Sequence, residues 1–228
     1  MSSTFDRYDK SYQHVVADSI AFSGLKHHFF LKAKARVLER LFATHFGNKR
    51  PAVIDVGCGI GAMHPLLAPL CNSLAGADPS VDCIERARAD NPAVSYAHAD
   101  GQHLPWSNAT FDVSLATCVF HHVAPSSRDA LVAEMRRVVR PEGLVVIIEH
   151  NPWNPGTRLA VARCPFDHDA VLLDWRESRE LLRRGGLDRI ENNHFLLLPF
   201  TGPLSVRIER VMARLPLGAQ YMSAGIVQ

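Results

Sequence analysis

Three aspartates stand at or near the carboxyl ends of short apolar runs in the first half of the chain. Asp55 lies in "AVIDVG", Asp78 closes "SLAGAD", and Asp100 closes "AVSYAHAD". Short apolar runs that alternate with helical patterns predict parallel strands, and open α/β sheets bind ligands at the carboxyl ends of such strands. The sequence therefore predicts a binding site that several carboxylates share.

A glycine-rich turn follows the first aspartate. "VGCGIGA" places Gly57, Gly59 and Gly61 between a strand and a helix. Glycine tolerates unusual backbone angles and lets a ligand approach the chain closely. The spacing Gly57-x-Gly59-x-x-Ala62 also satisfies the dinucleotide fingerprint, so the turn by itself favours neither ligand class.

The aspartates narrow the choice of ligand. Asp55 suits a ligand with an ammonium group, because a carboxylate there would repel a pyrophosphate. Asp78 can accept hydrogen bonds from both hydroxyls of a ribose, which either ligand class carries. Asp100 beside Gly101 suits the edge of an adenine. As alternatives, Asp78 and Asp100 cap a helix or a turn.

Histidines follow two further predicted strands and supply candidate proton acceptors. His122 comes after "FDVSLATCVF" and His150 after "LVVIIE". A neutral imidazole titrates near working pH and can take a proton. Alternatively His122 forms a wall of the cleft, and His150 positions the next loop by a hydrogen bond. His27 and His28 are further candidates, with a surface position at a helix start as the alternative.

The bulk composition indicates one soluble domain. The chain has 228 residues, a formal net charge of +2 and five cysteines without a C-x-x-C pair. This predicts neither a disulfide framework nor a structural zinc site, and with no H-E-x-x-H motif we expect no metal. Because no apolar run is long enough for a membrane span and "MSSTFDRYDK" lacks the features of a secretion signal, we expect a cytoplasmic protein.

The order of patterns predicts how these residues are positioned. A helix is expected from about Ser11 to Phe46, ended by Gly47, before alternating strands and helices. Residues 151–169 resemble a loop. A helix through "DWRESRELLRRGG", a strand through "HFLLLPF", a helix through "LSVRIERVMARL" and an apolar run "QYMSAGIV" follow. A helix between two strands ordinarily predicts a parallel crossover.

The ordered set of glycine turn and aspartates resembles class I S-adenosylmethionine (SAM) dependent methyltransferases over roughly residues 51–150. It looks closest to the small-molecule, quinone-methyltransferase-like branch known as methyltransferase type 11. The resemblance implies a Rossmann-like seven-stranded, mostly parallel sheet with an antiparallel last strand, helices on both faces and an N-terminal helical cap. We expect residues 1–48 to form the cap, 49–150 the SAM-binding core, and 151–228 a substrate-shaping insert with the sheet edge.

The resemblance also implies roles for individual residues. Asp55 would contact the amino group of SAM, Asp78 the ribose, and Asp100 with Gly101 the adenine, while Tyr8 or Tyr12 covers the cofactor. The remaining predicted cofactor contacts are Gly57, Cys58, Gly59, Gly61, Pro79, Thr117 and Cys118. The candidates for a role in catalysis are His122, His150 and His28.

The expected function is methyl transfer from SAM to an oxygen, nitrogen or carbon of a small molecule, in specialised metabolism, with S-adenosylhomocysteine as product. Such an in-line displacement needs alignment of donor and acceptor rather than a metal or a covalent enzyme intermediate. The alternatives are a nucleic-acid methyltransferase, which the near-neutral charge disfavours, an NAD-dependent oxidoreductase, and a SAM-binding subunit without activity of its own. We expect a monomer or homodimer.

The stretch "EHNPWNPG" contains Asn151-Pro152-Trp153, which resembles a triplet with which amino-methyltransferases hold a target amine. That motif follows the fourth strand and has two prolines, whereas this one follows the fifth strand and has one. We therefore interpret it as a stiffened exit from the strand, because a residue before proline is held extended. Trp153 is then expected to be a wall of the acceptor pocket or an anchor for a lid.

Overall fold

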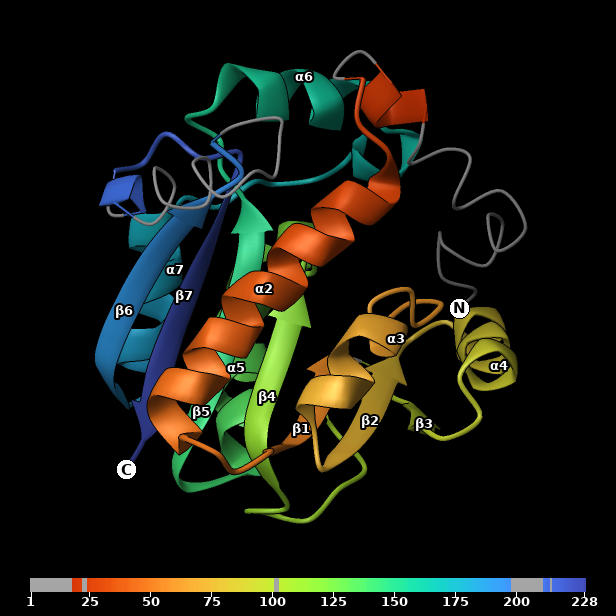
Figure 1. The fold of residues 1–228 in the computed structure, drawn as a ribbon, viewed down its shortest axis with the longest axis vertical. Helices are drawn as coiled ribbons and strands as arrows, with labels where there is room; N and C mark the ends of the chain where they lie inside the picture. The colour runs from red at the N-terminus through yellow and green to blue at the C-terminus, as the bar shows by residue number, and fades with distance from the viewer. Residues whose placement is uncertain (1–17, 22–23, 101–102, 198–210, 214) are drawn as a thin grey trace.

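The computed structural model describes residues 18–21, 24–100, 103–197, 211–213 and 215–228 and shows a seven-stranded sheet in the order β3-β2-β1-β4-β5-β7-β6 (Figure 1). Strands β1 to β5 are parallel, and β7 lies antiparallel between β5 and β6. This confirms the expected fold class and the antiparallel last strand. The strands are β1 (Ala52–Val56), β2 (Ser73–Asp78), β3 (Ser95–His98), β4 (Phe111–Thr117), β5 (Val139–His150), β6 (Leu187–Phe195) and β7 (Gln220–Val227).

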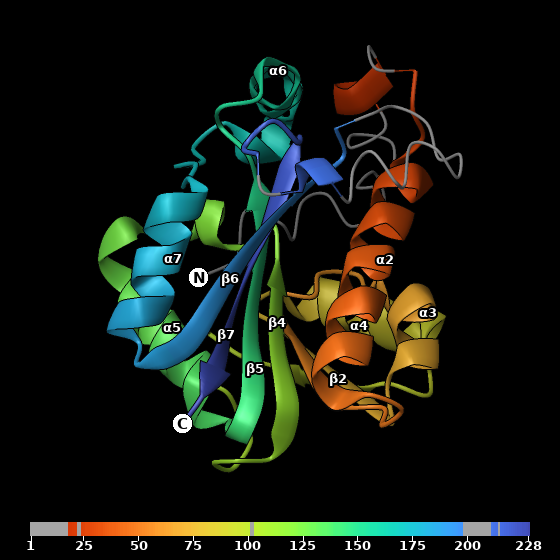
Figure 2. The ribbon, with the colours of Figure 1, turned by 60° about the vertical axis from the view of Figure 1, so that its left-hand side comes forward.

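Helices cover both faces of the sheet (Figure 2). One hydrophobic cluster joins α2, α3 and α4 to the first face, and a second joins α5 and α7 to the other. The helices are α2 (His27–Phe46), α3 (His64–Leu67), α4 (Val81–Asp90), α5 (Arg128–Arg137), α6 (Pro155–Arg163) and α7 (Trp175–Arg184). None of the helices in the described part of the chain is long and apolar enough to cross a membrane.

Strand β5 shows why its sequence is almost wholly apolar. Leu144, Val146 and Ile148 face the cluster under α2, while Val145 and Ile147 face the cluster under α5 and α7. Successive side chains of a strand point to opposite faces, so a strand covered on both sides needs apolar residues throughout. Glu149 follows this run and is nevertheless only 1% exposed, which makes it a buried charge at the edge that carries the ligand site.

The N-terminal helix is shorter than the predicted range from Ser11 to Phe46. Helix α2 begins at His27, and Gly24, at a φ of 69°, interrupts the helical pattern before it. Residues 11–17 lie outside the described part. The C-terminal end is confirmed, because α2 stops at Gly47, whose φ of 63° takes the chain out of the helix.

The prediction of a loop over residues 151–169 is wrong. The structure places α6 there, with Asn154 at its N-cap accepting from the backbone N–H of Thr157 and Pro155 at the first helical position. Asn and Pro are common both in loops and at the first positions of helices, so the sequence pattern alone did not distinguish a loop from a helix start here. Strand β6 also starts earlier than expected, and most of the helix predicted in "LSVRIERVMARL" lies outside the described residues.

Candidate functional site

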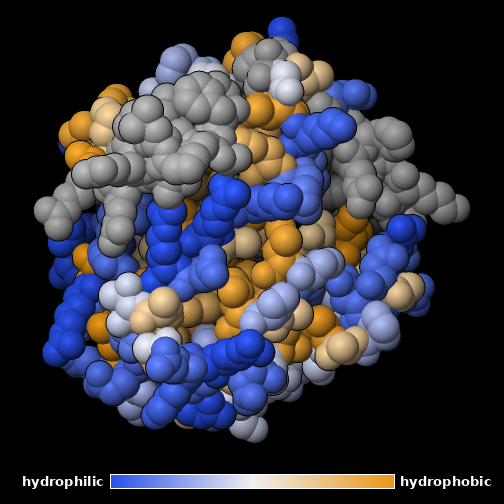
Figure 3. All heavy atoms as spheres, in the orientation of Figure 1, coloured by the Kyte–Doolittle hydropathy of each residue, from blue (hydrophilic) through white to orange (hydrophobic). Residues whose placement is uncertain are grey.

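A cavity of about 770 Å³ lies at the carboxyl ends of β1, β2, β4 and β5, bounded by α2 and α6. On the face shown in Figure 3, hydrophobic side chains gather near the middle and hydrophilic ones border them. The volume is typical of a small-molecule site. The cavity lining includes these residues that the sequence predicted: Asp55, Gly57, Cys58, Gly59, Asp78, Pro79, Asp100, Thr117, Cys118, His122 and His150.

Several predicted residues lie elsewhere. His28 is exposed and is not in the cavity lining, whereas His27 is, because a helix turns neighbouring side chains in different directions. Gly61 is also outside the lining, and a Cβ there would meet the hydroxyl of Tyr96. Its role is thus close packing of the turn. Gly101, Tyr8 and Tyr12 lie outside the described residues.

The glycine turn is tied to the end of β2. The backbone N–H groups of Gly57 and Cys58 both donate to the carbonyl of Ala77, at 2.7 and 3.0 Å. The N–H of Gly59 donates to Asp78 Oδ2 at 2.8 Å. Gly57 has a φ of 75°, and a Cβ on it would stand 2.5 Å from Val119 Cγ2. The turn therefore requires glycine at this position for both its conformation and its packing.

Asp55 keeps one carboxylate oxygen unpaired. Its Oδ2 lies 3.1 Å from His64 Nε2, and His64 in turn bonds the hydroxyl of Tyr96. Among the described residues, Asp55 Oδ1, Thr117 Oγ1 and Gln220 Oε1 are buried without a hydrogen-bond partner, and all three residues line the cavity. Buried polar atoms are normally hydrogen-bonded. These oxygens are therefore able to accept hydrogen bonds from a ligand, and the carboxylate of Asp55 suits an ammonium group.

The other two aspartates accept backbone hydrogen bonds. Asp78 accepts from the N–H of Ser80 at 2.9 Å as well as from Gly59, and the exposed Asp100 accepts from the N–H of His103 at 3.1 Å. The capping alternative is thus partly correct. A carboxylate has about four acceptor sites, so accepting these two bonds does not by itself prevent Asp78 from accepting from a ligand's hydroxyls.

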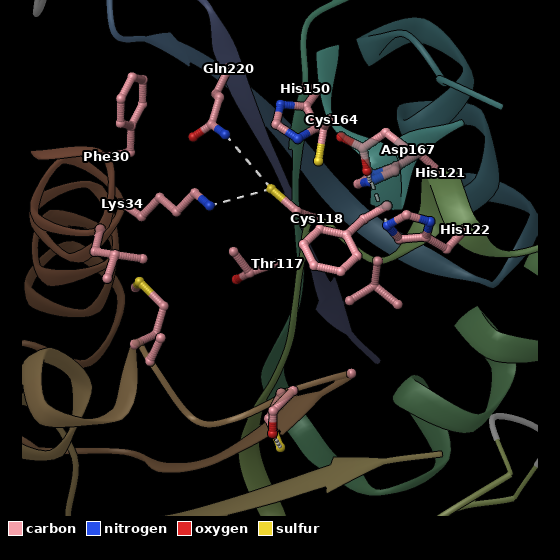
Figure 4. Close-up of a pocket in the computed structure, with 18 of the residues that line it drawn as sticks. Phe30, Lys34, Thr117, Cys118, His121, His122, His150, Cys164, Asp167 and Gln220 are labelled. Carbon is pink, nitrogen blue, oxygen red and sulfur yellow. Dashed lines mark hydrogen bonds and ion pairs between the residues drawn. The ribbon is translucent and has the colours of Figure 1, made fainter. Parts of the chain in front are cut away.

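A cluster of histidines and acids occupies the other end of the cavity (Figure 4). His121, in the 3₁₀ turn Phe120–His122 after β4, lies with Nδ1 2.7 Å from Glu149 Oε2 and Nε2 3.4 Å from Asp167 Oδ1. His122 Nε2 approaches the same oxygen of Asp167 at 3.4 Å. His150 lies against His121, with ring centroids 5.1 Å apart. Three imidazoles therefore surround one carboxylate.

The environment shifts the pKa of His121, Glu149 and His122. Burial alone lowers the pKa of His121, but the charges and hydrogen bonds of Glu149 and Asp167 outweigh it and raise the pKa to about 10. Burial alone raises the pKa of Glu149, but His121 outweighs it and lowers the pKa to about 2. Burial and the neighbouring His121 lower the pKa of His122 to about 4.

Cys118 stands between the two ends of the cavity. It adopts a φ of 56°, and its Sγ accepts from Lys34 Nζ at 3.3 Å and from Gln220 Nε2 at 3.6 Å. Burial by itself raises the pKa of its thiol, but Lys34 and His150 outweigh burial and lower the pKa to about 7. Figure 4 shows Lys34 reaching across from α2 toward this sulfur.

Four functional candidates were missed from sequence: Lys34, His121, Glu149 and Asp167. Two carried a signal. Lys34 interrupts the buried stripe of Leu31, Ala35 and Leu38, and it is only 7% exposed. Glu149 ends a buried apolar strand. A charge inside an apolar pattern points to a function or a partner, since burying it alone is costly.

Trp153 does not line the cavity, so its predicted role as a pocket wall is wrong. The ring is 46% exposed and lies under the guanidinium of Arg176, 4.8 Å from the ring centroid. Asn151 instead holds the start of the "NPWNPG" stretch in place, because its amide donates to the carbonyls of Pro216 and Gly218. Asn154 and Thr157, a few residues on, do line the cavity.

Comparisons with known proteins agree on the family. A family profile described as a methyltransferase domain matches residues 54–147. Methyltransferase GfsG of Streptomyces halstedii is 32% identical over 171 residues, 70% of this chain and 61% of its own length. A ubiquinone biosynthesis O-methyltransferase of Rhizobium etli is 31% identical over 113 residues, 48% of this chain and 45% of its own length.

A third relative is the tRNA (carboxymethyluridine(34)-5-O)-methyltransferase of Saccharomyces cerevisiae, 37% identical over 42% of this chain and 34% of its own length. This chain thus spans less than two thirds of each of these three relatives. A crystal structure of a SAM-dependent methyltransferase from Thermotoga maritima, described as a possible histamine N-methyltransferase, matches with a TM-score of 0.66 at 18% identity, over 98% of both chains. Residues 54–147 thus match a methyltransferase domain, and the chain has the fold of the class I SAM-dependent methyltransferases.

Proposed function

We propose that this protein transfers the methyl group of SAM to a small-molecule acceptor. The observation that carries the proposal is a single cavity that joins two chemically distinct ends. One end presents the glycine turn, Asp55 and Asp78, and the other presents His121, His122 and His150. A cavity of about 770 Å³ is large enough for a nucleoside-sized cofactor together with a small acceptor.

The first end would hold the cofactor. Asp55 Oδ1 would accept from the ammonium group of its methionine part, and Thr117 Oγ1 and Gln220 Oε1 are further unpaired oxygens of residues that line the same cavity. Asp78, with Pro79 beside it, would accept from the ribose hydroxyls, and Asp100 would lie toward the adenine. Gly57, Cys58 and Gly59 leave room for the ligand along the backbone of the turn.

The second end would receive the acceptor. A lone pair on its oxygen, nitrogen or carbon attacks the methyl carbon of SAM, while the carbon–sulfur bond breaks and its electron pair passes to sulfur, giving S-adenosylhomocysteine. The acceptor's proton leaves to a base or to solvent. His122 and His150 line this end and are the candidates for that base. The chain's main contribution would be alignment and exclusion of water.

The proposal also assigns roles to the segments before and after the predicted SAM-binding core. Residues 1–48 would cap the site, and 151–228 would shape the acceptor end, which agrees with α2 and α6 bounding the cavity. We further propose a cytoplasmic monomer or homodimer. The ubiquinone biosynthesis O-methyltransferase among its relatives favours an oxygen acceptor.

A nucleic-acid acceptor is the second candidate, because one relative is a tRNA methyltransferase. A net charge of +2 on 228 residues gives little electrostatic attraction for phosphates. An NAD-dependent oxidoreductase is disfavoured by the buried, unpaired oxygen of Asp55, which would repel a pyrophosphate.

Binding of S-adenosylhomocysteine tests the cofactor half of the proposal. Calorimetric titration should give a saturable site, and thermal unfolding should shift upward with ligand, while NAD⁺ should do neither. Asp78→Ala should weaken binding by about 10- to 150-fold, since a charge-assisted hydrogen bond contributes about 1.5–3 kcal/mol. Asp82→Ala, an exposed neighbour in α4, is the matched control. Stabilisation by NAD⁺ instead would overturn the proposal.

Turnover tests the acceptor half. The protein is incubated with SAM carrying a deuterated methyl group and with panels of phenols, carboxylic acids, amines and total tRNA. Formation of S-adenosylhomocysteine with a deuterated small-molecule product is the expected result. Deuterium found in the tRNA fraction, and in no small molecule, would replace the proposal with the second candidate.

A further inference from the structure

Three side chains at the acceptor end of the cavity are arranged as metal ligands are. One ligand atom from each of His121, His150 and Asp167 lies within 4.8 Å of the other two. They come from three separate segments, namely the turn after β4, the end of β5 and the turn Pro165–Asp167 after α6. No contiguous motif marks such a set, and the sequence accordingly led us to expect no metal.

We propose that His121, His150 and Asp167 form a binding site for one divalent transition-metal ion. Small rotations of these side chains bring their ligand atoms to the spacing of a common coordination sphere, since His121 Nε2 and Asp167 Oδ1 already lie 3.4 Å apart. In Figure 4 the three side chains lie together on one wall of the pocket.

Glu149 supports this assignment as an outer partner of His121. Its Oε2 bonds His121 Nδ1 at 2.7 Å, which leaves Nε2 facing Asp167. Glu149 is itself fixed, because its Oε1 accepts from the N–H of Phe120 and its Oε2 from the N–H of His150. A carboxylate behind a ligating histidine sets the ring's orientation and raises its basicity in metal sites.

The convergence of several imidazoles on one carboxylate is the second argument. A simple ion pair between His121 and its two acids needs a single imidazole. Here His122 Nε2 also points at Asp167 Oδ1 from 3.4 Å, and His150 packs against His121. A cation bound by Asp167, His121 and His150 would take the place of the Nε2 proton of His121, which is released on binding, with His122 beside the site.

The ligand types indicate which metal is taken. Two imidazoles and one carboxylate suit Zn²⁺, Fe²⁺ or Co²⁺ rather than Mg²⁺ or Ca²⁺, which prefer oxygen ligands. Three protein ligands leave open positions on the cavity side, and with His150 bound to the metal, His122 would remain as the candidate base. If the proposed methyl transfer is correct, an acceptor hydroxyl bound there would ionise more readily, so the acceptor should present an oxygen atom to the metal.

Cobalt titration of the full chain, stripped of metal with a chelator, tests the site without any cofactor. We expect one Co²⁺ per chain with visible absorption bands of a nitrogen- and oxygen-bound ion. His150→Ala and Asp167→Asn should each weaken binding more than tenfold. The matched controls are His168→Ala and Asp169→Asn, at side chains that are 86% and 97% exposed, and they should bind as the parent does.

Glu149→Gln adds a test of the outer partner and should weaken Co²⁺ binding about 10–100-fold. Thermal unfolding of each variant without metal separates loss of the site from loss of the fold. Unchanged Co²⁺ affinity in Asp167→Asn would overturn the proposal, because the ion would then be held by other histidines. Absence of Co²⁺ binding to the parent chain would do the same. Failure to bind S-adenosylhomocysteine would count only against the proposed function.

Discussion

Gly57 has two separate reasons to lack a side chain. Its φ of 75° is unfavourable for other residues, and an added Cβ would meet Val119 at 2.5 Å. Gly57→Ala should lower the free energy of unfolding by about 2–5 kcal/mol, from backbone strain and overpacking together. Denaturant unfolding measures this change, and calorimetry should show weaker binding of S-adenosylhomocysteine.

Gly47→Ala is the matched control for Gly57→Ala. Gly47 has a similar φ of 63°, but a Cβ there would meet nothing within 4 Å. Only the strain of its backbone conformation should remain, about 1–3 kcal/mol, without an effect on ligand binding. Equal losses in the two variants would show that packing against Val119 contributes nothing.

His27 should make the protein sensitive to acid. Burial, with Lys34 and His28 adding to it, lowers the pKa of His27 from 6.5 to about 4 in the folded state. As the pH falls below 6.5 the unfolded chain takes up the proton first, so stability is lost between pH 6.5 and pH 4. His27→Gln should remove on the order of 1–3 kcal/mol of that loss.

Denaturant midpoints at pH 7 and pH 4.5 measure this effect. His28→Gln, at the exposed neighbouring position, is the control and should keep most of the parent's acid sensitivity, because burial is the largest cause of the pKa shift of His27 and His28 the smallest. If His27→Gln loses as much stability between these pH values as the parent, another group is responsible for it.

The location of a single residue was predictable from sequence where its place at the end of a strand is enough to put it on the cavity. Asp55 and Asp78 stand at the ends of β1 and β2, so the alternation of strands and helices sufficed to place them on the cavity. We predicted His28, whereas it is His27 that lines the cavity. One step along a helix turns the side-chain direction by about 100°, and the sequence pattern did not fix which of the two neighbours faces inward. Asp167 joins the site only through the path of α6, which local patterns do not encode.

Among the elements, the turn that carries His121 and His122 is held by one buried arginine. Arg128, at the start of α5, is 1% exposed. Its guanidinium donates to the carbonyls of Phe120, Val123 and Val171 and pairs with Glu177 at 2.6 Å. The same side chain thus joins the histidine turn, α5, the segment before α7 and α7 itself.

Arg128→Met should therefore destabilise the protein by about 3 kcal/mol or more, because three carbonyls lose their donor. The histidine turn should loosen as well, which hydrogen exchange at residues 120–123 would report. Arg184→Met is the control, since its pair with Asp129 is about half exposed and should contribute less than about 1 kcal/mol. A similar loss in both variants would contradict this account.

The elements were predictable to different degrees. The strands that build the sheet carry apolar runs of the right length, and α7 shows a strong amphipathic pattern closed by Gly185, so these were found. Helix α6 has only Thr157 buried and hence shows no apolar stripe. Its position over the cavity depends on tertiary contacts of Asn151, Asn154 and Thr157 with residues 216–219.

At the scale of the molecule, two different parts of the chain line the two ends of the cavity. The sheet edge supplies the proposed cofactor end, and α6 supplies Ala160 and Val161 to the acceptor end. Ala160→Trp should fill the acceptor end and abolish turnover while leaving the affinity for S-adenosylhomocysteine within about twofold. Calorimetry and the deuterated-methyl assay measure the two effects separately.

Leu159→Trp is the control for Ala160→Trp, because Leu159 lies on the same helix, is 42% exposed and does not line the cavity. It should leave turnover unchanged. If Ala160→Trp weakens binding of S-adenosylhomocysteine as strongly as it lowers turnover, the two ends of the cavity are not separate.

The place of β7 in the sheet has a consequence for how the chain acquires its structure on the ribosome. Strand β6 emerges before β7, yet its partner in the sheet is β7, which must insert between β6 and β5. Until then the hydrogen-bonding edges of β5 and β6 are both unsatisfied, and such edges recruit other chains. Completion of the sheet is therefore a late, long-range step, and the nascent protein is most prone to aggregation just before it.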